Sequence, residues 1–324
     1  MASLENVLVG TALMVFCFFC LLLNFAVFLV IALNSDFYVH TSYKIMLLMG
    51  VFDVSQLCVH FLTGLFTVIQ YEADYVVYKV MGTIISGGYE TWVFVTVILA
   101  FNRFVLFCFP AREKQIFSST GNKIWLLATI AVYALFAGIQ ASSKVYSKYL
   151  IDIYQWKYDY SYAWSRIRKD VVIYYQLGGV FVAWLFYIAV VIKLFRYRNE
   201  AGSSTRSKAN QKLLIHAFVI TVYCTIQNFL WHKIDVFIPE GKVQNVVLNM
   251  MWVGNGGLST LLCLILNQQV RRKIWNYLRK AINKNGVIST FTVSKINSSS
   301  LALSTQIRSS ISQTPRPSLT PTVA

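Results

Sequence analysis

The sequence predicts an all-α protein: a bundle of seven transmembrane helices, an amphipathic helix on the inner leaflet and a disordered cytoplasmic tail. Of its 324 residues, 56% are hydrophobic and only 13% are charged, whereas soluble chains average about 25% charged residues. Seven stretches approach or exceed the roughly 20 mostly apolar residues that cross a bilayer. Lys and Arg gather in alternate connections between them. Such a composition excludes an ordinary soluble enzyme, a disulfide scaffold and a disordered protein.

The predicted spans follow the apolar stretches in order. The first is expected to be a retained helix rather than a cleaved signal peptide, because no Lys or Arg precedes it and its apolar run is too long for a signal core. The alternation typical of a membrane barrel is absent. We therefore expect helices over residues 7–33, 43–69, 80–109, 124–141, 171–195, 213–236 and 243–266.

The charge distribution predicts the orientation. With the amino terminus outside, the cytoplasmic segments hold 20 of the 29 Lys and Arg and three of the 13 acidic residues. Positive charge favours the cytoplasmic side, and anionic inner-leaflet lipid reinforces this preference. The net charge of +16 thus indicates topology rather than a nucleic-acid partner. We expect a multi-pass protein of the plasma membrane.

The carboxyl-terminal region divides into two predicted parts after a transmembrane domain over residues 1–266. In residues 267–285, Ile274, Leu278 and Ile282 recur at helical spacing among basic residues, which predicts an amphipathic helix on the inner leaflet. Residues 286–324 are rich in Ser and Thr and lack carboxylates, which is typical of disorder. We consider two hypotheses for this tail: it is a phosphorylation cluster that engages a kinase and arrestin, or it is an inert solvated segment.

Sequence patterns for catalysis and metal binding are absent. All six cysteines fall within predicted spans, so we expect no extracellular disulfide. Neither a metal-ligand spacing, a phosphate-binding loop nor a nucleophile motif occurs. We therefore expect no cofactor, no metal and no catalytic residues, and the protein is not predicted to be an enzyme.

Polar residues inside the predicted spans are the main functional signal. Ionisable groups within a bilayer are costly and are functional candidates by default. Asn24 and Asp53 lie in the first two spans, and Arg103 lies near the inner end of the third. This order and depth is the polar pattern of a seven-helix receptor. The alternative is that Asn24 and Asp53 only form hydrogen bonds to neighbouring helices.

Several motifs then occur in a fixed order: Tyr43-Lys44-Ile45-Met46, Gly50-x-x-Asp53-x-x-Gln56-Leu57, Thr63-Gly64, Trp92 and Leu99-Ala100-x-Asn102-Arg103. In these motifs the chain resembles the nematode serpentine receptors of class T, which are rhodopsin-like chemoreceptors, most strongly over residues 42–117. The resemblance implies a G-protein-coupled receptor of sensory neurons, with the sensory cilium as its location. It implies a small-molecule cue outside and a heterotrimeric G protein inside. Sibling nematode chemoreceptor classes stay open.

The resemblance also implies roles for residues in the inner half of the bundle. Asn102 stands where rhodopsin-like receptors usually carry an acidic residue, so Arg103 lacks an adjacent carboxylate and raised basal activity is expected. Residues 259–263 stand where Asn-Pro-x-x-Tyr is usual, without the proline and tyrosine. The expected polar switch comprises Asn24, Asp53, Asn255 and Ser259. The expected G-protein face comprises Asn102, Arg103, Phe104 and Arg112.

A ligand pocket is expected in the outer half of the bundle. Glu90 precedes Arg103 by about 20 Å of helix, and aromatic walls with a few convergent polar groups typify small-molecule sites. The candidate residues are Tyr89, Glu90, Tyr175, Gln227, Trp231, His232, Asn249 and Trp252. An ionised Glu90 would suit an amine, a protonated one would donate a hydrogen bond, and a structural role is a third reading. We expect no internal ion pair, because the predicted spans place no Lys or Arg near Glu90.

The alternative function is a transporter or channel for a small solute. It would require paired broken helices and a continuous polar path, whereas the polar residues are sparse and no predicted span contains proline. The sequence specifies neither the ligand nor the G-protein subtype.

Overall fold

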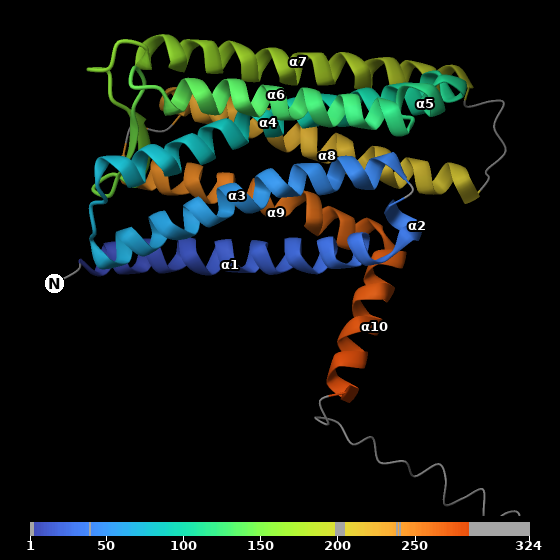
Figure 1. Ribbon diagram of the computed structural model, residues 1–324, viewed down its shortest axis with the longest axis horizontal. Coiled ribbons are helices and arrows are strands. Elements are labelled where there is room, and N and C mark those ends of the chain that lie inside the picture. Colours follow the sequence, from blue (N-terminus) through green and yellow to red (C-terminus); the bar gives the residue numbers. More distant parts are fainter. Residues whose placement is uncertain (1–2, 39, 198–204, 238, 240, 285–324) are drawn as a thin grey trace, which may run out of the picture. The chain divides into compact units, whose positions relative to one another are not determined.

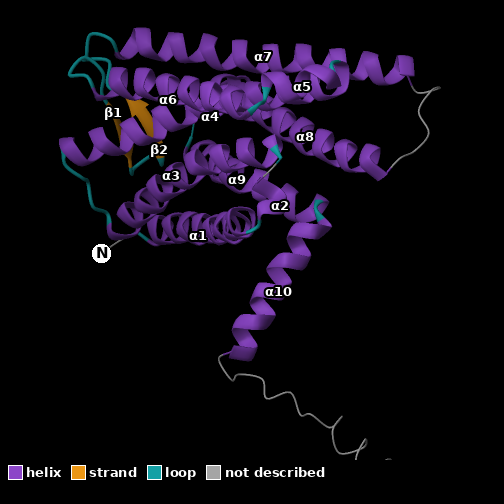
Figure 2. Ribbon diagram, turned by 45° about the vertical axis from the view of Figure 1, so that its right-hand side comes forward, coloured by secondary structure: helices purple, strands orange, loops and turns teal. Residues whose placement is uncertain are grey.

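The computed structural model describes residues 3–38, 40–197, 205–237, 239 and 241–284. Seven of its helices are long and apolar enough to cross a membrane, which confirms the predicted all-α, seven-span fold. The elements, shown in Figures 1 and 2, are α1 (Leu4–Leu33), α2 (Ser35–Tyr38), α3 (Thr41–Ile69), α4 (Tyr75–Cys108), α5 (Pro110–Ile116), α6 (Ser119–Ala141), β1 (Ser147–Leu150), β2 (Gln155–Tyr158), α7 (Ser165–Tyr197), α8 (Thr205–Lys233), the short 3-10 helix Ile234–Val236, α9 (Lys242–Leu266) and α10 (Gln268–Lys284).

The membrane-spanning helices begin before the apolar stretches from which they were predicted, whereas α8 ends at Lys233, three residues before the predicted end. A side chain at the start of a helix satisfies its free backbone N–H groups, but such a polar residue lowers local hydropathy. Asp74 accepts from the Val77 amide at 3.0 Å at the start of α4, and Ser118 accepts from the Gly121 amide at 3.1 Å before α6. Helix α7 begins at Ser165 rather than at residue 171, so nearly two additional turns, with the buried Arg168, belong to the helix.

Small residues bring α1 close to α3 and α9. A Cβ on Gly10 would lie 2.6 Å from the carbonyl oxygen of Gly64 on α3, and one on Gly257 of α9 would lie 2.6 Å from Sγ of Cys20. Such contacts require glycine, because backbones that approach this closely leave no space for a side chain. On the outer side of α1, Phe18 and Phe25 are exposed, as expected for a face covered by lipid.

Helix α4 packs against α3, α6, α7 and α8. Its inward residues Trp92, Val95 and Leu99 are almost completely buried and belong to the largest hydrophobic cluster. This one helix carries Glu90 towards the end that is predicted to face outside and Arg103 towards the end that is predicted to face inside, so it connects the two candidate sites.

A short antiparallel hairpin precedes α7, and the sequence analysis did not predict it. Strands β1 and β2 pair with Ser147 opposite Tyr158 and Leu150 opposite Gln155. Between them, Tyr154 adopts a left-handed backbone with φ of 54°, a conformation that is unfavourable for a bulky side chain.

Hydrogen bonds to three helices hold this hairpin. The Tyr154 hydroxyl donates to Asn6 Oδ1 at 2.5 Å, and Asn249 Nδ2 donates to the Tyr154 carbonyl oxygen. Asn245 Nδ2 donates to the Ile153 carbonyl oxygen at 2.9 Å, and Gln140 Nε2 donates to Ser147 Oγ at 2.9 Å. These bonds to α1, α6 and α9 fix the hairpin without a disulfide, because all six cysteines are free.

Helix α10 (Gln268–Lys284) lies where the sequence predicts the amphipathic helix. Asn267 begins it, because its Oδ1 accepts from the backbone amides of Gln269 at 3.0 Å and Val270 at 3.3 Å. The predicted disordered tail, residues 286–324, and its boundary with the amphipathic helix lie outside the described residues.

Candidate functional site

An outer cavity of about 610 Å³ lies between α4, α7, α8, α9 and the hairpin. This volume falls within the range of about 300–1,000 Å³ that is usual for small-molecule sites. Six of the eight predicted pocket residues line it, namely Tyr89, Glu90, Gln227, Trp231, His232 and Trp252. The sequence analysis therefore identified much of the wall that the helices provide.

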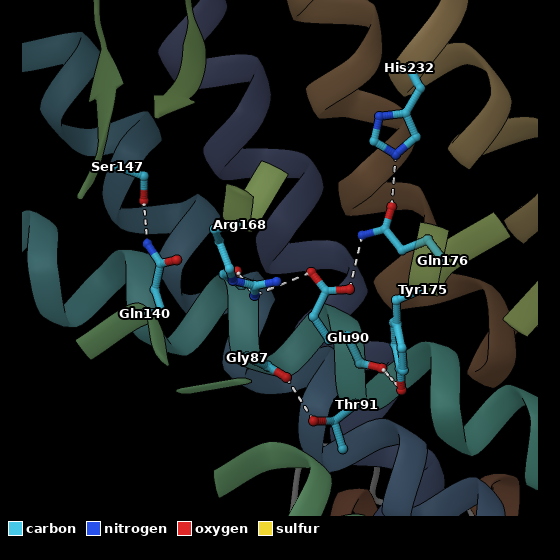
Figure 3. Close-up of polar contacts among 10 residues, drawn as sticks. Gly87, Glu90, Thr91, Gln140, Ser147, Arg168, Tyr175, Gln176 and His232 are labelled. Atoms are coloured by element: carbon cyan, nitrogen blue, oxygen red, sulfur yellow. Dashed lines mark hydrogen bonds and ion pairs between the residues drawn. The ribbon is translucent and has the colours of Figure 1, made fainter. Parts of the chain in front are cut away.

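Glu90 forms a buried ion pair, and the prediction of no such pair was wrong. Arg168 Nη2 lies 3.7 Å from Glu90 Oε1, and the two side chains are only 1% and 3% exposed (Figure 3). Arg168 also donates to Ser86 Oγ at 2.9 Å, and its guanidinium stacks 4.9 Å from the ring centre of Phe136. Arg168 was assigned to an outer loop because the predicted span began at residue 171, whereas α7 begins at Ser165, nearly two turns earlier.

A hydrogen-bonded chain continues from Glu90 to α8 (Figure 3). Gln176 Nε2 donates to Glu90 Oε2 at 3.1 Å, and Gln176 Oε1 lies 2.9 Å from His232 Nε2. An amide oxygen can only accept, so Nε2 of His232 carries the proton. Both carboxylate oxygens of Glu90 therefore have partners on α7, and Gln176 connects Glu90 to His232 on α8.

Trp252 joins the cavity to the interior of α3. It lines the cavity, and its ring lies edge-on to Trp231 at 4.9 Å and to His60 at 5.0 Å. Its Nε1 donates to Gln56 Oε1 at 2.7 Å. Gln56 lies one turn from Asp53 on α3, so a ligand that contacts Trp252 contacts a side chain bonded to the polar interior.

The two other predicted pocket residues, Tyr175 and Asn249, do not line the cavity but form hydrogen bonds to residues of its wall or of the hairpin. Tyr175 donates its hydroxyl to the Glu90 carbonyl oxygen at 3.2 Å. Asn249 anchors the hairpin through Tyr154. The sequence analysis missed the hairpin side of the cavity, where Trp156, Lys157 and Tyr158 line it. The aromatic spacing of residues 154–158 was the available signal.

The four residues of the predicted polar switch do not form one hydrogen-bonded network among the described residues. Asn24 Nδ2 donates to the Gly256 carbonyl oxygen at 2.8 Å and so ties α1 to α9. The Ser259 carbonyl oxygen lies 2.9 Å from His216 Nε2 on α8. Asp53 is completely buried, with Trp92 beside its carboxylate. Among the described residues, Asn255 Oδ1 has no hydrogen-bond partner.

The predicted G-protein face is closed in this structure. Arg103 is completely buried, and none of its three side-chain nitrogens has a hydrogen-bond partner within the described part of the chain. Asn102 Oδ1 accepts from Ser42 Oγ at 3.5 Å. Phe104 packs 5.3 Å from the Phe186 ring, and Arg112 is exposed. The guanidinium of Arg103 therefore does not reach the inner surface here.

Seven membrane-spanning helices around an aromatic outer cavity, with a buried arginine at the inner end, define a seven-transmembrane receptor. The chain belongs to the family described as serpentine type 7TM GPCR chemoreceptor Srt, whose model matches residues 1–286. This family is one of nematode-type chemoreceptors and not of enzymes. No curated protein matches the chain. The membership confirms the resemblance seen in the sequence motifs.

Proposed function

We propose that this chain is a chemosensory receptor of the plasma membrane, with its amino terminus outside, that binds a small molecule in the outer cavity and activates a heterotrimeric G protein inside. The observation that carries the proposal is the position of Trp252, which both lines the cavity and donates to Gln56 beside Asp53. A ligand can thereby alter the polar interior between the cavity and the inner face.

The inner face supplies the second half of the proposal. A buried charge without partners is costly, so the burial of Arg103 destabilises the closed arrangement relative to one in which the guanidinium reaches water or a partner. The bond between His216 and Ser259 ties α8 to α9 on this side. A ligand that binds the open form more tightly would shift the two-state equilibrium towards it and present Arg103, with Asn102, Phe104 and Arg112, to a G protein.

The test is nucleotide exchange on purified G proteins by the full chain in nanodiscs. Arg103→Ala should abolish receptor-dependent exchange, basal and ligand-stimulated, while Arg103→Lys should retain part of it because the charge is kept. Ligand affinity should stay within about threefold, a change below 1 kcal/mol. Unchanged exchange in Arg103→Ala would contradict the assignment. Flux of a solute without exchange would favour the transporter alternative.

The location and the tail partners are part of the same proposal. Membership of the chemoreceptor family supports the sensory cilium as the location. The Ser- and Thr-rich residues 286–324 are proposed to engage a kinase and arrestin, because each phosphate would add about −1.5 to −2 of charge.

A further inference from the structure

Positively charged side chains outnumber negatively charged ones among the residues that line the outer cavity. Lys157 of β2, Lys169 of α7 and Lys233 of α8 line it and are exposed, so positive charge reaches it from three elements. Glu90 is the one carboxylate among the described lining residues. Three lysines and one glutamate give the lining of the cavity an excess of positive formal charge.

The single carboxylate is already neutralised. Glu90 Oε1 faces Arg168 at 3.7 Å, and Oε2 accepts from Gln176 at 3.1 Å. Both partners belong to α7 and are buried, so this pair is built into the wall. An amine that took the place of Arg168 on Glu90 would leave a buried guanidinium unpaired, which is strongly unfavourable.

Two further groups, one on the wall and one behind it, favour a ligand that accepts hydrogen bonds. Trp156 lines the cavity, and its Nε1 is a buried donor without a partner among the described residues. Arg168, directly behind Glu90, likewise has two buried nitrogens, Nε and Nη1, without partners. Donors without acceptors are the complement of an anion.

The remaining wall is aromatic. Trp231 and Tyr89 both pack edge-on against Trp252, at 4.9 and 5.1 Å between ring centres. These surfaces suit an apolar body, and they lie on α4, α8 and α9, whereas Lys157 and Trp156 come from the hairpin. The cavity therefore offers an apolar wall and a cationic rim.

We infer that the outer cavity binds a small organic anion, namely a monocarboxylate with an apolar body whose carboxylate lies among Lys157, Lys169 and Lys233. The inference rests on the proposed function in placing the ligand in this cavity, and it replaces the amine suggested by Glu90 alone. The lysines also attract anions towards the entrance at long range, and that attraction weakens with salt.

The test measures binding directly, without a G protein. The probes are matched carboxylates, amides and amines built on propyl, phenylpropyl and indolylethyl bodies. Affinity is read from the shift in thermal unfolding of the full chain in nanodiscs of zwitterionic lipid. At least one carboxylate should bind about tenfold more tightly than its amide and amine, the scale of a hydrogen bond to a charged group, and high salt should reduce this preference.

The variant that tests the rim is Lys157→Gln/Lys169→Gln/Lys233→Gln, which removes three exposed charges and should leave the fold intact. It should lose the carboxylate preference. The matched control is Lys148→Gln, which removes an exposed lysine from the same hairpin. Lys148 pairs with Glu72 at 3.4 Å and does not line the cavity. The control should keep the preference.

Three results would overturn the inference: an amine or amide that binds as tightly as its carboxylate, a preference that survives the triple substitution, or no binding by any carboxylate at millimolar concentrations. Failure of the proposed function has a different signature. A chain that binds the carboxylate but promotes no nucleotide exchange would refute receptor coupling and leave the ligand class standing.

Discussion

Replacing Arg168 with leucine should destabilise the receptor strongly, because among the described residues it leaves the buried Glu90 side chain with Gln176 as its one remaining side-chain hydrogen-bond partner. The charges lie 3.7 Å apart, and the two side chains are 1% and 3% exposed. At an effective dielectric of 20 their attraction is about 4 kcal/mol, and removal of one partner of a buried pair typically costs about 3–5 kcal/mol. We expect Arg168→Leu to lower the thermal unfolding midpoint and the amount of receptor at the cell surface.

The double variant Arg168→Leu/Glu90→Gln isolates the charge. It removes both ions together, and replacement of a buried pair by neutral groups is often close to neutral, so much of the lost stability should return. The control is Lys148→Gln, whose exposed pair with Glu72 should contribute at most about 1 kcal/mol. The reasoning would be refuted if the single and double variants unfolded at the same temperature in nanodiscs.

Further predictions concern the cavity wall, the hairpin and the topology. Trp252→Phe keeps a ring but removes the donor to Gln56, so stimulated nucleotide exchange should fall about fivefold, the equivalent of one hydrogen bond, while probe affinity changes less; equal exchange would contradict this link. Asn249→Ala should speed amide hydrogen exchange in β1 and β2, whereas unchanged protection would show that this anchor is dispensable. Burial raises the pKa of Tyr154 from 10.0 to about 12, so its bond to Asn6 should stabilise the hairpin fully below pH 10 and be lost as the pH rises through about 12; the pH dependence of thermal unfolding, compared with that of Tyr154→Phe, measures this. Tags on intact cells should be accessible at the amino terminus and not at the carboxyl terminus, and a surface-accessible carboxyl terminus would reject the orientation.

The spans could be predicted from composition because lipid imposes a single requirement, a helix of sufficient apolar length. The same reasoning failed for Arg168. A hydropathy window ends where charged residues begin, but α7 continues outward from the apolar stretch to Ser165. A charged residue one turn beyond an apolar run can thus still point into the bundle, and only its partner, Glu90, reveals that it does.

The hairpin could not be predicted for a different reason. Each strand has four residues, which is too short for a clear alternation of polar and apolar side chains. What holds it are bonds to Asn6, Asn245 and Asn249, which are far away in the chain. Six residues of the helical wall, on α4, α8 and α9, could by contrast be predicted from the sequence, because aromatic and polar side chains at that depth stand out in an apolar helix.

The hairpin is fastened by hydrogen bonds, so at this end of the described structure there is no disulfide for a reductant to cleave. All six cysteines are free, and the bonds of the hairpin to α1, α6 and α9 contain no sulfur. The hairpin should therefore keep its contacts in reducing as well as in oxidising media.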